Sequence, residues 1–457
     1  MKLLLMIGLT LYGSWGAIAV HAFCGVAIYY FFAILRPQFI WEYSLPIGIS
    51  WSYYVALASM LGAFVWRMAP IISSSRNLGV KFPSLNAAHL GMMFFAFWIT
   101  VTYLTALHPL VAKPYYDEYQ KIFIMYFVSA LVITNVRQLW ILYLIVTLTL
   151  MYIGWEINDY YFFKGAMFIY RRGYGGLDNN GAALMLAMGV PLCLFAWDGI
   201  RHWSRWGFLL AIPIIIHAVL TSYSRGAMLS LIISIPLYLI RCRNRKQLVV
   251  ILLMIAFMIP IMAGKEIQER FFSISESETD DSAQSRFTSW AIAWQMANER
   301  PIFGFGIRNS SLYTLAYGAD MEGRVIHSQY LQIAADSGFV GMGAYLFAIG
   351  AFLVCLRRVR HRVKNHLGVV SSLLSSMAWF VLRRWTLPQH EGRDDPDARK
   401  AYVMANGLEG AMLVFCFGSI FLSLETFELP YIVMLMGAQL AAVFQLEDST
   451  PKQVETA

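Results

Sequence analysis

Three residues have side chains and positions suited to phosphate binding and proton transfer. Arg225 follows a turn of a few residues between two apolar stretches, Arg286 lies in a long polar loop, and His327 begins a later apolar stretch. Guanidinium groups bind phosphate oxygens through paired, charge-assisted hydrogen bonds. An imidazole has a pKa near neutrality, which suits a general base. On one membrane face, these three residues suit a lipid-linked diphosphate with a proton acceptor beside it.

Each of these residues also has a structural interpretation. Arg225 sits close to membrane depth, where an ionisable group is costly and indicates function, but its side chain can also reach the outer headgroups. His327 can be satisfied as a helix cap or in the interface. A helix N-terminus disfavours the imidazolium and a nearby diphosphate favours it, so the sequence leaves its protonation state open.

A glycine-rich stretch carries two further candidates. RRGYGGLDNNGAA, residues 171–183, combines two arginines, a flexible turn and adjacent amides just before an apolar stretch. Arg172 and Asn180 are therefore candidates for contacts with a diphosphate or a glycan. The alternative is a polar loop that ends in a helix cap at Asp178 or Asn179.

The long loop 264–326 holds nine acidic residues against six basic ones. It is therefore not a generally positive surface, and Arg286 and Arg308 would act as individually placed groups. We expect a helix over SRFTSWAIAWQMANERP, with Ser285 as N-cap and one stripe of apolar residues. FGFGIRN, residues 303–309, is a glycine-punctuated turn that carries Arg308. The stripe consists of Phe287, Trp290, Trp294 and Ala297.

The cysteines and histidines do not show metal-ligand spacing, and no outer cluster of carboxylates is apparent. We expect structural thiols, no disulfide framework, no metal and no cofactor. The five cysteines fall in apolar stretches or at their basic edges: Cys24, Cys193, Cys242, Cys355 and Cys416.

The composition is that of a membrane protein. Hydrophobic residues make up 58% of the 457 residues, charged residues only 14%, and the mean hydropathy is +0.56. A soluble domain carries roughly a quarter charged residues. The net charge of +8 does not indicate nucleic acid, because basic residues set topology in membrane proteins. We therefore predict an all-α polytopic membrane protein.

Polar interruptions divide the chain into about twelve predicted transmembrane helices. The first is expected to be one long or broken helix, bent around Gly13 to Gly16. The predicted crossings are 4–35, 50–67, 86–106, 119–134, 138–154, 181–197, 206–221, 226–240, 247–263, 327–356, 403–423 and 430–446.

These crossings give five regions. They are a transmembrane bundle at 1–263, a periplasmic loop with short helices at 264–326, and a transmembrane helix at 327–356 that starts at His327. A basic cytoplasmic loop follows at 357–402, and then two helices and a tail at 403–457.

The basic residues predict the orientation. One set of alternating loops, with both tails, holds 22 of the 35 Lys and Arg, which predicts that both termini are cytoplasmic. The stretch 366–385 is apolar but has bases at both ends. A spanning helix there would invert everything after it, so an interfacial helix fits better.

Short motifs resemble those of the O-antigen ligase and O-antigen polymerase superfamily. HSQYL at 327–331, followed by Asp336-Ser-Gly338 and Gly341, resembles its histidine motif. SRG at 224–226 resembles its membrane-embedded arginine motif. Together with a third motif in the long loop, these motifs occur in order on one side of twelve crossings, and that combination is fairly specific.

The third motif lies in the long loop. Arg286 with Trp290, then Pro301, Gly304 and Gly306, resembles the family's outer-loop pattern of Arg, Trp and P-x-x-G-x-G. The turn at 178–180 resembles a usual Asn-Pro-Asn, without the proline. The resemblance covers roughly 170–345 by motif and the other crossings by topology.

The resemblance implies a metal-independent, inverting glycosyltransferase of the GT-C type. Arg225 and Arg286 would hold the diphosphate and stabilise its charge on departure, and His327 would take the proton of the acceptor hydroxyl. Trp290 and Tyr330, which belong to the motifs, join the candidates for substrate binding.

Within this superfamily we expect an O-antigen ligase of the bacterial inner membrane, with its site facing the periplasm. The implied donor is a glycan on undecaprenyl diphosphate, and the acceptor is lipid A–core. An O-antigen polymerase and a protein O-oligosaccharyltransferase are alternatives that share these motifs. A lipid-linked glycan flippase or other transporter would need polar residues near mid-bilayer and an internal repeat, whereas the polar groups gather on one face.

Overall fold

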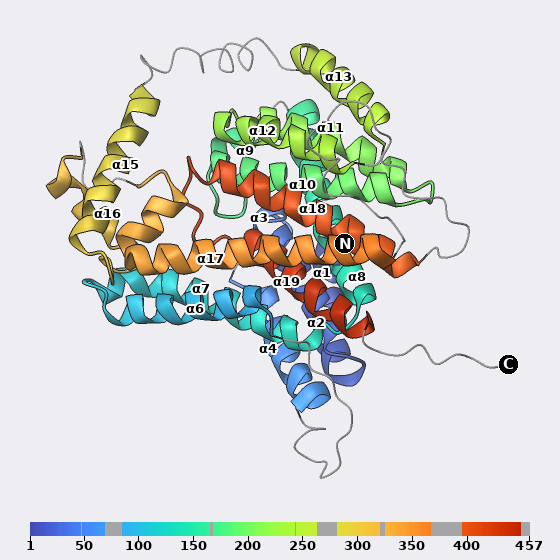
Figure 1. Ribbon diagram of the computed structural model, residues 1–457, viewed down its shortest axis with the longest axis horizontal. Coiled ribbons are helices and arrows are strands. Elements are labelled where there is room, and N and C mark those ends of the chain that lie inside the picture. Colours follow the sequence, from blue (N-terminus) through green and yellow to red (C-terminus); the bar gives the residue numbers. More distant parts are fainter. Residues whose placement is uncertain are drawn as a thin grey trace.

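The described part of the computed structural model is helical. It comprises residues 1–46, 48–68, 85–164, 168–242, 244–262, 281–319, 325–366 and 395–448, and no β-strand occurs among them. This confirms the predicted all-α class (Figure 1). Six helices are long and apolar enough to cross a membrane: Lys2–Ala19, Ala87–Leu104, Val136–Lys164, Asn179–Gly199, Gln329–Val363 and Pro396–Gly418.

Shorter helices complete the bundle and the outer loops. Four apolar helices of 10–17 residues, at Phe23–Leu35, Trp51–Trp66, Arg205–Leu220 and Glu428–Phe444, accompany the six longer ones. The count of about twelve crossings stays a prediction, since the lengths of these helices do not decide how many of them cross the membrane.

In chain order the helices are α1 (Lys2–Ala19), α2 (Phe23–Leu35), α3 (Pro37–Ile40), α4 (Trp51–Ala63), the π-helix η1 (Phe64–Met68), α6 (Ala87–Leu104), α7 (Pro109–Val132), α8 (Val136–Lys164), α9 (Phe168–Arg172), α10 (Asn179–Gly199), α11 (Arg205–Leu220), α12 (Arg225–Arg241), α13 (Arg245–Met262), α15 (Asp281–Glu299), α16 (Ser310–Tyr313), the 3-10 helix η3 (Thr314–Tyr317), α17 (Gln329–His366), α18 (Pro396–Gly418) and α19 (Glu428–Asp448).

The expected first crossing is a helical hairpin. The bend predicted at Gly13 to Gly16 is wrong, because α1 is continuous there and the chain leaves the helix only after Ala19. Both glycines let α2 approach closely: a Cβ at Gly13 would lie 3.0 Å from Ile28, and one at Gly16 would lie 3.0 Å from Cys24. The cytoplasmic placement of the two termini, which no contact of α1 or α19 tests, stays a prediction.

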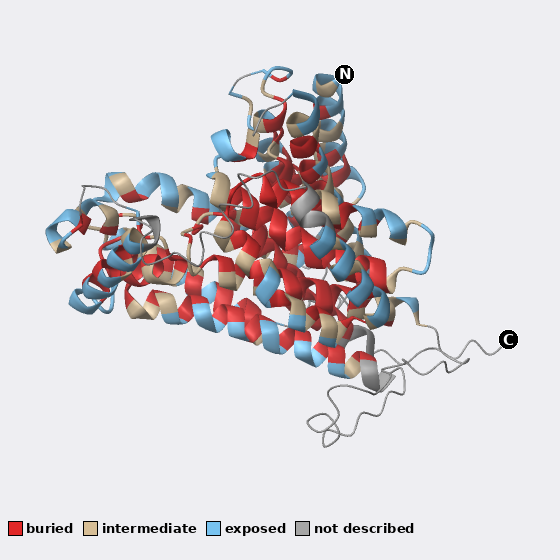
Figure 2. Cartoon of the chain, turned by 90° about the horizontal axis from the view of Figure 1, so that it is seen from above, coloured by how far each residue is buried: buried red, intermediate tan, exposed pale blue. Residues whose placement is uncertain are grey.

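Helix α10 forms the centre of the bundle. Of its best membrane-length window, 94% is buried, because α8, α11, α12 and α18 all pack against it. Figure 2 shows the buried residues gathered in the middle of the molecule and the exposed ones on the surrounding helices. A helix that is apolar all round is typical of such a fully enclosed position.

Helix α17 is interrupted at Gly338. Its backbone there has φ 70° and ψ 176°, a conformation that is essentially restricted to glycine. The transmembrane helix predicted at 327–356 therefore differs in three respects. It begins at Gln329 rather than at His327, it breaks at Gly338, and it continues beyond 356 to His366.

The glycine turn 301–306 docks against this interruption. The backbone N–H groups of Phe305 and Gly306 donate to the carbonyls of Ala335 (3.0 Å) and Asp336 (2.8 Å), which the break leaves without helical partners. In return, the N–H of Phe339 donates to Pro301 O at 2.7 Å. Buried backbone groups must be paired, so the turn 301–306 and the break in α17 satisfy each other's backbone hydrogen bonds.

Some predictions fall outside the described residues. The first part of the predicted periplasmic loop, up to residue 280, and the proposed interfacial helix after His366 both lie there. Two predicted ends are corrected by the described residues. The crossing expected to reach residue 423 ends at Gly418, and the helix expected to start at Ser285 starts at Asp281, which leaves Ser285 in its interior.

Replacement of Gly338 by alanine should destabilise the fold. A Cβ at this position would clash with the Ile302 carbonyl, and the backbone conformation alone costs a non-glycine residue about 1–3 kcal/mol. The control is Gly343→Ala in the same helix, where a Cβ meets nothing within 4 Å and alanine should stabilise by about 0.5–1 kcal/mol. Melting temperatures of the purified proteins in detergent test this; equal values for both variants would contradict the role of the break.

Candidate functional site

The turn 419–427 between α18 and α19 is where the predicted site segments meet. The N–H of Gln329, at the start of α17, donates to Ser419 O at 2.9 Å, and the Gln329 side chain accepts a hydrogen bond from the N–H of Leu424. A Cβ added at Gly181, in α10, would lie 2.9 Å from Leu424. The turn therefore fixes the start of α17 against the rest of the bundle.

Phe421 brings two arginine-bearing helices to this turn. Its ring centroid lies 5.9 Å from that of Trp290 in α15. A Cβ at Gly226, next to Arg225, would lie 3.7 Å from the Phe421 side chain. Arg286 lies one helical turn before Trp290, so the helices that carry Arg225 and Arg286 both approach Phe421.

Trp290 links this pair of helices to His327. Its indole Nε1–H donates to the backbone oxygen of His327 at 2.9 Å. A hydrogen bond of this kind contributes about 0.5–1.5 kcal/mol net. His327 is half-buried, between the buried residues Ile326 and Ser328. Trp290, which was expected to bind substrate, thus holds the histidine backbone in place.

Arg225 occupies the first turn of α12. Ser224 is the N-cap, and its side chain accepts from the N–H of Ala227 at 3.4 Å. Tyr223, just before it, has φ 58°, which is uncommon for a residue with a Cβ. The side chain of Arg225 is half-buried, and the positive end of the helix dipole adds to its charge.

The buried face of helix α15, which carries Arg286, differs from the predicted apolar stripe. The predicted stripe lies on one side of the helix, but it is not uniformly buried: Phe287 and Trp294 are exposed, whereas Ala297 is buried. The buried face carries Ile292, Ala293 and Met296, which pack with Phe305, Ala319, Ile326 and Ala335 in a small outer core. The outer core therefore covers the face of the helix next to the predicted stripe.

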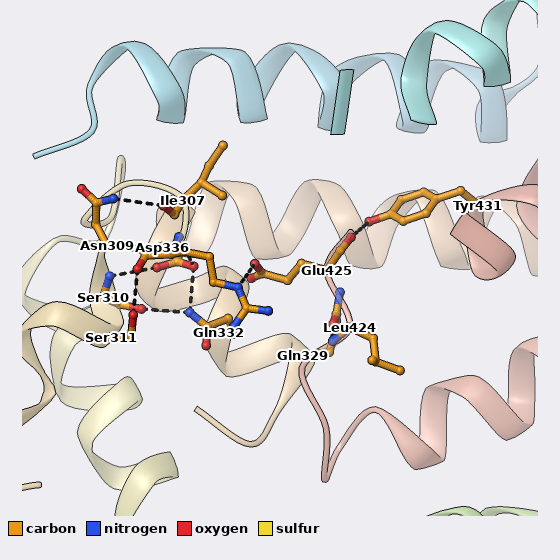
Figure 3. Close-up of polar contacts among 11 residues, drawn as sticks. Ile307, Asn309, Ser310, Ser311, Gln329, Gln332, Asp336, Leu424, Glu425 and Tyr431 are labelled. Atoms are coloured by element: carbon orange, nitrogen blue, oxygen red, sulfur yellow. Dashed lines mark hydrogen bonds and ion pairs between the residues drawn. The ribbon is translucent and has the colours of Figure 1, made fainter. Parts of the chain in front are cut away.

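Arg308 belongs to a buried cluster of charges, whose carboxylates Asp336 and Glu425 are labelled in Figure 3. Its Nε lies 3.3 Å from Glu425 Oε2, with side-chain exposures of 18% and 2%. Its backbone N–H donates to Asp336 Oδ2 at 2.9 Å, which stabilises its left-handed backbone of φ 58°. Asp336 also accepts from the N–H of Ser310 at 3.1 Å and from Gln332 Nε2 at 2.8 Å. The cluster joins the glycine turn, α17 and the turn 419–427.

One arginine faces two carboxylates in this cluster. Burial raises the pKa of the Glu425 carboxyl to about 8; the charge of Arg308 acts against the shift and that of Asp336 adds to it. We infer that Arg308 compensates one carboxylate, while Glu425 retains a proton at neutral pH. Arg308 was expected to contact a diphosphate or glycan, but its guanidinium is already engaged.

The glycine-rich stretch 171–183 is mainly structural. Arg172 is exposed and forms two hydrogen bonds with Glu42, of 2.6 and 3.0 Å, and this pairing lowers the pKa of the Glu42 carboxyl. Asp178 caps α10 by accepting from the N–H of Gly181 at 2.7 Å, as in the alternative interpretation of a helix cap at Asp178 or Asn179. The nearest partners of the Asn180 amide are Asn179 at 3.3 Å and Asp178 at 3.5 Å.

Tyr330 is also engaged within the protein. Its hydroxyl donates to Cys416 O at 2.9 Å and accepts from Ser419 Oγ at 3.2 Å. Of the predicted site residues, the structure thus draws the segments of His327, Arg225 and Arg286 together around Phe421, and it uses Trp290, Tyr330 and Arg308 to hold that arrangement. Arg172 is tied instead to the segment after α2.

Sequence reasoning missed the turn 419–427. Its first residues were assigned to the end of a crossing, because FCFGSIFLSL is mostly apolar and carries no charge. The available signal was the acidic residue Glu425 beside this stretch, between two apolar segments. In the described residues, no group of three or more His, Cys, Asp or Glu side chains is arranged to hold a metal ion.

Comparison with models of protein families gives a match over part of the chain. Residues 210–346 match a family model described as O-antigen ligase. The matched range contains Arg225, Arg286, Trp290 and His327 and ends before α18. A search of curated proteins found no match.

Glu425→Gln should remove part of the pH dependence of stability. The carboxyl pKa is raised from 4.5 to about 8 in the folded protein, so its stabilising contribution is present below pH 4.5 and is lost as the pH rises through about 8. Wild type should therefore lose stability relative to the glutamine variant across this window. Melting temperatures measured over the window test this, with Glu42→Gln, which replaces a half-buried, arginine-paired carboxylate, as control. Parallel curves for wild type and Glu425→Gln would contradict the assignment.

Proposed function

We propose, from the premise that the chain belongs to the O-antigen ligase and polymerase superfamily, that it is an O-antigen ligase. It would transfer a glycan from undecaprenyl diphosphate to lipid A–core at the periplasmic face of the bacterial inner membrane. The multi-pass helical architecture supports a reaction between two lipid-anchored substrates. The product would be complete lipopolysaccharide.

The proposed chemistry is one inverting displacement. The acceptor hydroxyl oxygen attacks the anomeric carbon, the bond from that carbon to the phosphate oxygen breaks, and the undecaprenyl diphosphate leaves with the electron pair. His327 takes the hydroxyl proton. Arg225 and Arg286 bind the diphosphate and stabilise the negative charge that develops on it. The protein architecture would be of the GT-C type.

The observation that carries this proposal is the contact of Trp290 with both His327 and Phe421. The indole N–H holds the His327 carbonyl at 2.9 Å, and the indole ring lies against Phe421, which also adjoins Gly226. This arrangement supports a common site for a base and two arginines that are far apart in the sequence. Arg308, Trp290 and Tyr330 are assigned to positioning, because their contacts join the glycine turn, α15 and α17 to the segments around Phe421.

The ligase assignment is tested by analysing lipopolysaccharide from a strain that lacks this protein. A ligase predicts full-length glycan that accumulates on the carrier lipid, with lipid A–core left bare. A polymerase predicts single repeat units on lipid A–core, and a protein O-oligosaccharyltransferase predicts unchanged lipopolysaccharide with loss of glycan from proteins. Either of these last two results would replace the ligase proposal.

Lysine should be a poor replacement at Arg225 and at Arg286. A lysine keeps the charge but cannot form paired hydrogen bonds with a diphosphate, so transfer should fall at normal protein levels. Arg300→Lys, at an exposed position directly after α15, serves as the matched control and should transfer normally. Full activity of both the Arg225 and Arg286 variants would show that charge alone, or topology, is their role.

Transfer should persist in EDTA, because the proposed mechanism stabilises the leaving diphosphate with guanidinium groups. The measurement is in vitro transfer by the purified protein before and after chelation. Loss of transfer that Mg²⁺ or Mn²⁺ restores would contradict the metal-independent mechanism.

His327→Ala should still fold and bind the lipid-linked donor, since the arginines make the diphosphate contacts. Transfer should fall by about 10²–10⁴-fold, the usual contribution of a positioned base. His327→Gln should be nearly as impaired, because glutamine retains hydrogen bonding but cannot accept the proton. The measurement is turnover at saturating donor, normalised to folded protein.

The control is His108→Gln, in which an exposed histidine that pairs with Tyr313 is replaced. It should retain wild-type turnover. A His327→Gln variant with wild-type turnover would assign His327 to the helix start instead of to the chemistry.

A further inference from the structure

Helix α15 has an exposed apolar face beside an exposed polar one. Phe287 and Trp294, seven residues apart, lie on one side of the helix and are 56% and 53% exposed. Thr288, Gln295 and Glu299 form the adjacent exposed face, which is polar. The outer core covers the opposite side of the helix. An amphipathic pattern of this kind is typical of helices that lie at a membrane surface.

The apolar face continues onto two helices that can span a membrane. The ring of Trp294 lies 5.4 Å from that of Phe339 in α17. The ring of Phe303, just beyond α15, stacks on Trp98 of α6 at 5.7 Å and an interplanar angle of 7°. Phe97, beside Trp98, is 60% exposed. Both α6 and α17 contain candidate membrane spans, so the exposed surface of α15 joins the surface that these spans present to lipid.

The direction of α15 agrees with this surface. Figure 1 shows it running across the end of α17 instead of along it. A helix crossing the end of a spanning helix lies near the plane of the membrane. In water, the exposed parts of Phe287, Trp294, Ile302 and Phe303 would lose the favourable free energy of burying apolar surface, and aromatic residues are enriched at the level of lipid headgroups.

We propose that α15 is an in-plane membrane helix. Phe287, Trp294, Ile302 and Phe303 insert into the boundary between headgroups and acyl chains, in the leaflet next to the C-terminal end of α6. The occupant of this apolar face is therefore bilayer lipid. The inference concerns membrane contact alone and does not depend on the transfer reaction.

A spin label on each exposed face tests this in the full chain reconstituted in phosphatidylethanolamine–phosphatidylglycerol vesicles. Cys24 and Cys416 are first replaced by alanine, and the three buried cysteines are retained. Labels are placed at Phe287→Cys and Trp294→Cys, with Thr288→Cys and Gln295→Cys on the polar face as matched controls. Collisions with oxygen, which concentrates in lipid, and with a water-soluble nickel chelate are then compared.

The proposal expects a severalfold higher ratio of oxygen to nickel collisions at 287 and 294 than at 288 and 295. Equal ratios at all four positions would overturn it, because the apolar face would then be in water. Low collision rates with both reagents at 287 and 294 would also overturn it, since protein, such as a second copy of the chain, would then cover the face.

A second measurement does not depend on the labelled variants. Lipids brominated near the headgroup should quench more tryptophan fluorescence in wild type than in Trp294→Phe, which keeps an aromatic ring at this position. Equal quenching of both proteins would place Trp294 outside the bilayer and contradict the proposal.

Discussion

A helix interrupted inside a membrane bundle must give its unpaired backbone groups to other partners, because no water is available to bind them. In α17 the break at Gly338 meets this constraint through the turn 301–306, which supplies two N–H donors and one carbonyl acceptor. The outer loop is thereby fixed to a spanning helix by backbone hydrogen bonds that are independent of its side chains. The position of Arg308, and through it that of Glu425, follows from this docking.

The buried cluster of Arg308, Asp336 and Glu425 affects the geometry of the fold more than its net stability. A buried ion pair gains little net stability, because desolvation offsets the attraction, but removal of one partner leaves a costly buried charge. Arg308, Asp336 and Glu425 come from three segments, so the cluster penalises any arrangement in which one segment is displaced. We interpret it as a determinant of geometry around His327, with the retained proton on Glu425 limiting the number of buried charges.

The sequence was most informative about class and about residues with special backbone requirements. Apolar runs predicted the helices, and the alternative interpretation of 171–183, a helix cap at Asp178 or Asn179, named the residue that caps α10, because a position before an apolar stretch is a local signal. The P-x-x-G-x-G pattern marked a turn that does require glycine, since Gly304 and Gly306 both have positive φ. The partner of that turn, the break in α17, could not be predicted, because it depends on a contact between segments far apart in the chain.

Two apolar patterns in the sequence did not indicate which parts of the protein would lie against them. The apolar stripe on α15 lies on one side of the helix, but the outer core covers the neighbouring face and leaves Phe287 and Trp294 exposed. The ring of Phe421 was taken as part of a crossing, although it lies in the turn that adjoins Trp290. In both cases hydrophobicity identified residues that avoid water without identifying what covers them.

The turn 419–427 lies well after residue 346, where the family match ends. Yet Ser419 receives the first N–H of α17, and Phe421 packs against Trp290. The matched region is therefore not a transferable module. A chimera that grafts residues 210–346 onto a related scaffold would inherit its motifs without the surface that assembles them, so exchange of specificity between relatives has to carry the last two helices as well.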